Sequence, residues 1–92
     1  MNRCLHITVR GRVQGVSFRF HTQKQAIKLN IRGFVRNLAE GDVEIVACGE
    51  PGALQQLVAW CHSGPTPARV SAVIVNPNPH HGGEFLNGFE IR

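Results

Sequence analysis

The first third of the chain changes from an alternating pattern of apolar and polar residues to a helical spacing. Leu5, Ile7 and Val9 alternate with polar residues, which predicts a strand with one buried face that ends at Gly11. Residues 19–29 contain neither Gly nor Pro, and their spacing predicts a helix. We expect its buried stripe to run through Phe20, Gln23, Ala26, Ile27 and Asn30.

The rest of the chain repeats this change of period. Residues 34–38 and 43–48 alternate on either side of a turn, which predicts a hairpin. Pro51 opens a second predicted helix, and the segment 63–67 ends it. Its apolar stripe is formed by Leu54, Leu57, Val58 and Cys61. A fourth strand from Val70, a loop rich in Pro and Gly at 76–83, and a short strand at 89–91 complete the chain.

The order βαββαβ predicts an α+β fold of the ferredoxin-like kind. In such a sandwich an antiparallel sheet carries two helices on one face. A chain of 92 residues has room for one hydrophobic core, so we expect a single domain over residues 1–92. Because this fold hosts many functions, it assigns none by itself.

Positive charge is concentrated in the first 39 residues. This segment holds eight Lys and Arg residues and no Asp or Glu, whereas the remainder carries a net charge of −4. Such a segment should attract anions, although a solvated basic face with no ligand would show the same charge.

The N-terminal residues show no apolar core of a signal peptide, and no apolar run is long enough to span a membrane. Cys4, Cys48 and Cys61 are odd in number and widely spaced, which argues against a disulfide framework and against a zinc site. We therefore expect a cytoplasmic protein with three reduced thiols and no membrane contact.

The loop between the first strand and the first helix is the strongest candidate for a binding site. It reads GRVQGVSFR over residues 11–19, and its glycines allow the positive φ angles at which successive N–H groups converge. Converging N–H groups at a helix N-terminus bind phosphate. The glycine spacing matches neither the P-loop nor the dinucleotide fingerprint, so the loop alone is a weak signal.

Arg19 strengthens the signal because a cation in a first helical turn faces the positive end of the helix dipole. The conflict costs about 0.3–1 kcal/mol, and a bound anion would remove it. A guanidinium also suits phosphate oxygens because it can donate two parallel hydrogen bonds. An Arg19 side chain that simply points into water would explain the sequence equally well.

The loop resembles the signature loop of the acylphosphatases. Two further blocks agree with this resemblance, GFVRN at 33–37 followed by GDVE at 41–44, and FEIR at 89–92. The resemblance covers nearly the whole chain. It implies metal-free hydrolysis of the carboxyl–phosphate bond of acyl phosphates to a carboxylate and inorganic phosphate, with no cofactor.

The resemblance also implies roles for particular residues. Arg19 would hold the phosphoryl oxygens, and Asn37 would position the attacking water. The phosphate would also be bound by the backbone N–H groups of Gly15, Val16, Ser17 and Phe18. Position 17 is often Gly in the family, so Ser17 is a departure from the pattern. The implied partners are a small acyl phosphate and inorganic phosphate, and we expect a monomer.

Other residues admit simpler interpretations. Asn37 could bond a neighbouring backbone, and Ser17 with His21 lacks the orienting acid that a nucleophile and its base need. Carboxylates at 40, 42 and 44 are more typical of a solvated turn than of a Mg²⁺ site. His80 and His81 have no partner at metal-ligand spacing.

Two rival functions share these features. RNA-recognition modules have the same βαββαβ order and a basic charge, but their third strand carries aromatic residues that stack on bases. Here the third strand reads VEIVAC over 43–48 and has none, so we expect no specific nucleic-acid binding. The second rival is a noncatalytic acylphosphatase-like regulatory domain.

Overall fold

A computed structural model describes residues 3–78 and 88–92 of the chain. Its elements are β1 (Arg3–Arg12), α1 (Phe18–Lys28), β2 (Arg32–Asn37), β3 (Val43–Gly49), α2 (Pro51–Cys61), β4 (Arg69–Pro77) and β5 (Phe89–Ile91). The predicted succession of strands and helices is confirmed. The fourth strand is longer than expected, because Asn76 and Pro77 continue the ladder opposite His6 and Leu5.

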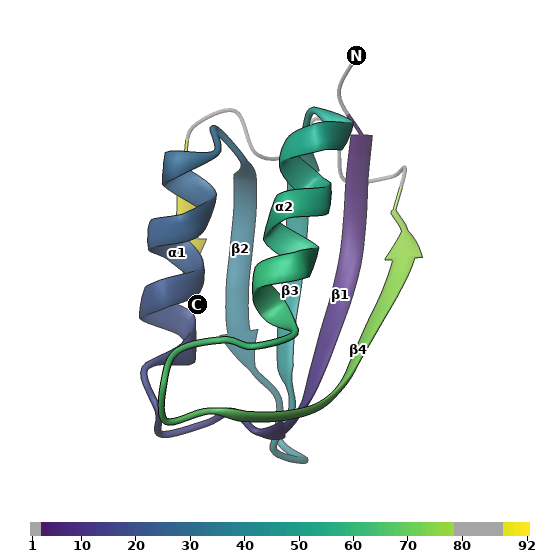
Figure 1. The fold of residues 1–92 in the computed structure, drawn as a ribbon. Coiled ribbons are helices and arrows are strands. Elements are labelled where there is room, and N and C mark those ends of the chain that lie inside the picture. Colours follow the sequence, from purple (N-terminus) through teal and green to yellow (C-terminus); the bar gives the residue numbers. More distant parts are fainter. Residues whose placement is uncertain (1–2, 79–87) are drawn as a thin grey trace.

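The five strands form one sheet in the order β4-β1-β3-β2-β5, and both helices lie on the same face of it (Figure 1). β1, β2, β3 and β4 pair in antiparallel fashion, whereas β5 pairs in parallel with β2 through the partners Gly33 and Phe89. The ferredoxin-like fold is thus confirmed, but the sheet is mixed and not antiparallel throughout. The reason is that β5 lies at the opposite edge from β4, beside β2, and β2 runs in the same direction as β5 (Figure 1).

The core fills the space between the sheet and the two helices. Ile7 and Val9 of β1, Val35 of β2 and Ile45 of β3 are fully buried there. They alternate with residues on the open face of the sheet, as the period of a half-buried strand requires. Leu54, Leu57 and Cys61 of α2 cover this layer, as its predicted stripe required, while Val58 is only partly buried.

The buried stripe predicted for α1 is wrong except at Ala26. Phe20 and Ile27 are 52% and 58% exposed, and the helix instead buries Phe18, Thr22 and Ala26. These three residues lie four positions apart and so form one line along the helix. Thr22 is tolerated in the core because its hydroxyl donates a hydrogen bond of 2.8 Å to the Phe18 carbonyl.

The expectation of three reduced thiols is also wrong. Cys4 of β1 and Cys48 of β3 are direct cross-strand partners and form a disulfide. Cys61 is a free, buried thiol, and burial raises its pKa to about 12. The spacing of cysteines therefore no longer supports a cytoplasmic location. No helix in the described part of the chain could cross a membrane.

Candidate active site

The loop between β1 and α1 lies at one end of the sheet, opposite the end at which β1 starts (Figure 1). It turns sharply because Gly15 has φ 74° and Ser17 has φ 63°. Gly15 reaches this left-handed region at no steric cost, whereas Ser17 reaches it against the preference of a residue with a Cβ. Ser17 is the residue that caps α1, and its side chain makes no capping hydrogen bond.

The backbone N–H groups of residues 15–18 are unpaired. Within the described part of the chain, none of them donates to a backbone or side-chain acceptor. The first turn of α1 also contains no acidic side chain. Unpaired donors at the positive end of a helix dipole form a site for an anion.

Arg19 and Asn37 bring two more polar groups to this loop. They line one pocket of about 390 Å³, Arg19 from the first turn of α1 and Asn37 from the end of β2. The other lining residues are Val13, Gly15, Ser17, Phe18, Phe20 and Ile91. Val16 is absent from this wall, because its side chain packs against the main core.

The two polar side chains differ in how they are held. Arg19 Nη1 donates a hydrogen bond of 3.3 Å to a backbone oxygen of Arg92. Asn37 Oδ1 is buried and has no hydrogen-bond partner among the described residues. A buried acceptor without a donor is costly, and this oxygen belongs to a side chain that lines the pocket.

Gln14 joins the loop to the strand that carries Asn37. Its Nε2 donates hydrogen bonds of 2.8 Å to the carbonyl of Leu38 and 2.9 Å to that of Asp42. Both carbonyls belong to the turn between β2 and β3, so Gln14 fixes the distance between the two halves of the site. Gln14 belongs to the loop motif of residues 11–19, but the motif by itself predicts no role for it.

The carboxylates near this turn are paired with cations on the open face of the sheet. Asp42 lies 3.2 Å from Arg10, and Glu44 contacts both Arg36 and His6, the latter at 2.8 Å. Burial raises the pKa of Glu44, but the hydrogen bonds from His6 and Arg36 and their charges outweigh burial and lower it. No cluster of three or more metal-ligating side chains occurs in residues 3–78 and 88–92.

Comparison with known proteins identifies the chain. The acylphosphatase family model matches residues 5–91. The chain belongs to the acylphosphatase family. An acylphosphatase of Geobacter sulfurreducens is 50% identical over 86 residues, which cover 94% of this chain and 92% of that protein.

Solved structures agree with this assignment. The acylphosphatase of Bacillus subtilis superposes with a TM-score of 0.91 at 36% identity, covering 100% of this chain and 99% of the other. That of Coxiella burnetii gives 0.90 at 42% identity, covering 99% and 93%. The chain is accordingly an acylphosphatase, a hydrolase that acts on acyl phosphates, and the predicted family, fold and activity are confirmed.

The acylphosphatase does not pair Ser17 with His21 as a nucleophile and its base. His21 Nδ1 lies 2.9 Å from the backbone oxygen of Ser17, one helical turn back along α1. The histidine is thus held by the backbone of the helix and not by the Ser17 hydroxyl. His80 and His81 lie outside the described residues.

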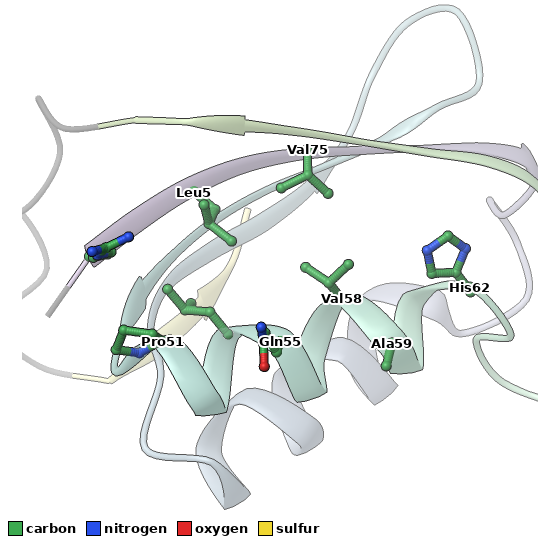
Figure 2. Close-up of a pocket in the computed structure, with 9 residues that line it drawn as sticks. Leu5, Pro51, Gln55, Val58, Ala59, His62 and Val75 are labelled. Carbon is green, nitrogen blue, oxygen red and sulfur yellow. The ribbon is translucent and has the colours of Figure 1, made fainter.

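A larger apolar groove of about 570 Å³ lies between α2 and the strands β1 and β4. Leu5 and Val75 point from the sheet toward the helix, and Val58 points back toward them (Figure 2). The groove shares no lining residue with the loop site and has few polar groups. The larger volume of this groove is therefore no reason to place the catalytic site there.

Proposed function

We propose that Arg19 and the backbone N–H groups of Gly15, Val16, Ser17 and Phe18 hold the phosphoryl group of an acyl phosphate, and that Asn37 positions the attacking water. One observation carries this proposal. One pocket is lined by residues of the loop, by a guanidinium-bearing side chain and by the amide of Asn37. Among the described residues, the loop N–H groups have no acceptor and the buried amide oxygen has no donor.

The chemistry follows from the charges of the substrate. Phosphate oxygens accept hydrogen bonds from the N–H groups and from the guanidinium, which neutralise charge as the phosphoryl group transfers. Water, held by Asn37, attacks phosphorus in line with the bond to the acyl oxygen. That bond breaks and the carboxylate departs with its electron pair. The water oxygen becomes part of inorganic phosphate, and the proton that it loses passes to a phosphate oxygen.

This reaction makes few demands on the protein beyond positioning. The leaving group is a carboxylate, which is stable without protonation, so no general acid is required. We accordingly propose that turnover is independent of metal. We also propose that the single domain acts as a monomer. We also propose that the protein is cytoplasmic.

The proposed roles predict different defects when Arg19 and Asn37 are changed. Arg19→Gln removes a charge-assisted contact, so phosphate should bind more weakly and kcat should collapse. Asn37→Ala leaves the phosphate contacts in place, so phosphate affinity should change little while kcat falls by about 10² or more. Competitive inhibition by phosphate and kcat on acetyl phosphate should be measured for both variants, after each is shown to be folded. Normal kcat in Asn37→Ala, or normal phosphate affinity in Arg19→Gln, would refute the roles.

Metal independence has a separate test. Phosphate release from acetyl phosphate should continue in excess EDTA, and millimolar phosphate should raise the thermal midpoint because it binds only the folded state. Loss of activity in EDTA with rescue by Mg²⁺ would overturn metal independence. A midpoint that phosphate leaves unmoved at low salt would contradict the phosphate site.

A further inference from the structure

The pocket has an exposed apolar wall beside its polar floor. Phe20 of α1 and Ile91 of β5 both line it, together with Arg19 and Asn37. Phe20 is 52% exposed and Ile91 is 41% exposed. Neither residue is needed to fill the core. Exposed apolar side chains beside a polar pocket indicate a ligand that has an apolar part.

Hydrogen bonds from α1 to β5 and to the residue that follows β5 hold this wall together. Gln23 Nε2 donates to the Phe89 carbonyl at 2.8 Å, and Arg19 Nη1 donates to the backbone oxygen of Arg92 at 3.3 Å. The two bonds fall on either side of Phe20 on the helix and on either side of Ile91 on the strand. The position of the wall relative to the loop is therefore fixed by the same contacts that hold Arg19.

The Phe20 ring is also supported by its neighbours on α1. The Lys24 ammonium lies 5.6 Å from the ring centroid, and the His21 ring meets it edge-on with centroids 5.3 Å apart. A cation near the aromatic ring and a perpendicular ring both restrict its movement. A ring held in advance costs less entropy when a ligand packs against it.

We propose that Phe20 and Ile91 bind the acyl group of the substrate and favour flat, apolar acyl groups over small ones. This inference rests on the proposed function, which places the phosphoryl group on the loop N–H groups and Arg19. The acyl group is then the remaining part of the substrate, and the apolar wall is the part of the pocket that suits it. Binding energy from this wall adds to that of the phosphate.

The test compares two exposed apolar residues on the same helix. Phe20→Ala removes the wall, and Ile27→Ala removes a side chain of similar exposure that does not line the pocket. kcat/KM should be measured for benzoyl phosphate and for acetyl phosphate in the wild type and in each variant. Phe20→Ala should lower the benzoyl-to-acetyl selectivity ratio about tenfold, the effect of losing roughly 50–60 Å² of apolar contact.

Two further variants complete the test. Phe20→Tyr keeps a flat ring and should keep the wild-type ratio, and Ile91→Ala should lower it. The inference is overturned if the ratio in Phe20→Ala stays within twofold of the wild type, or if Ile27→Ala lowers it equally. Failure of the proposed function would look different, because Arg19→Gln would then bind inorganic phosphate normally whatever the selectivity ratio does.

Discussion

At the scale of single residues, the site depends on an unfavourable backbone conformation at one position. Ser17 has φ 63° and ψ 26°, and a residue with a Cβ pays about 1–2 kcal/mol to adopt the left-handed region. In the proposed site the benefit is functional, since this turn would direct the N–H groups of residues 15–18 toward the phosphate. Its side chain makes no hydrogen bond in the described structure and contributes only its backbone to that turn.

Substitution of Ser17 should therefore change stability more than catalysis. Ser17→Gly should raise the free energy of unfolding by up to about 1 kcal/mol, because relief of the backbone conformation outweighs the added freedom of the unfolded chain. Both Ser17→Gly and Ser17→Ala should keep most of the activity, since each keeps the N–H group. Urea unfolding and kcat on acetyl phosphate would check this. A phosphoserine trapped on the wild-type protein would contradict water attack.

The sequence indicated residues 15–19 because they belong to one short motif at a strand-to-helix junction, and Asn37 because it belongs to a second motif, GFVRN at 33–37. It could not reach Gln14, because its hydrogen bonds go to backbone carbonyls 24 and 28 residues away, which no local pattern reveals. The face of α1 was misjudged for a related reason. The hydrophobicity of Phe20 and Ile27 predicts that they lie in the core, but Thr22 is buried there instead, because its hydroxyl is hydrogen-bonded within the helix.

At the scale of elements, three neighbouring strands are joined by one carboxylate. Glu44 of β3 contacts His6 of β1 and Arg36 of β2 on the open face of the sheet. Burial raises the pKa of Glu44, but these contacts outweigh burial and lower it below its ordinary value of 4.5. A lowered pKa means that the ionised form stabilises the fold, and this contribution is lost as the pH falls through the folded pKa.

Replacing Glu44 should reduce the loss of the free energy of unfolding at acid pH. The free energy of unfolding of the wild type should fall between neutral pH and about pH 3, and Glu44→Gln should show a smaller fall over the same interval. Urea unfolding across this range measures the difference. Equal slopes for the two proteins would show that Glu44 is not held more acidic in the folded state than in the unfolded one. Glu90 offers a control, because its carboxylate pairs with Arg92 at an exposed position.

The sheet topology was predictable only in part at this scale. Alternating residues identified the strands, because burial of one face leaves a period of two in the sequence. The direction of β5 was not readable, since a strand of three residues contains no signal that separates parallel from antiparallel pairing. The cross-strand cysteines were missed because spacing alone did not bring Cys4 opposite Cys48, whereas the register of β1 and β3 does.

At the scale of the whole molecule, the disulfide closes a long loop of chain. Cys4 and Cys48 are separated by 44 positions, and a cross-link of this span restricts the unfolded chain by about 4 kcal/mol in the loop-entropy account. Cys4 lies near the start of β1, eight residues before Arg12. It is therefore about 27 Å along the strand from the loop between β1 and α1.

Reduction should consequently weaken the fold and spare the chemistry. Adding a phosphine reductant should lower the free energy of unfolding by about 2–4 kcal/mol, with kcat on acetyl phosphate unchanged while the protein stays folded. A Cys4→Ala/Cys48→Ala double variant should show no response to the reductant, which separates the disulfide from other effects. Unchanged stability after thiol titration has shown full reduction would contradict the prediction.

The unpaired N–H groups of residues 15–18 have a consequence for the way this loop tolerates change. Nineteen of the twenty amino acids carry a backbone N–H group. Exchanging one of their side chains for another therefore leaves the hydrogen-bond donor in place. Proline alone removes the donor, since it has no N–H. The loop can therefore change in sequence while its N–H donors persist, provided that its turn geometry is kept. A scan of single prolines through residues 15–18 would reveal functional groups that a scan of alanines passes over.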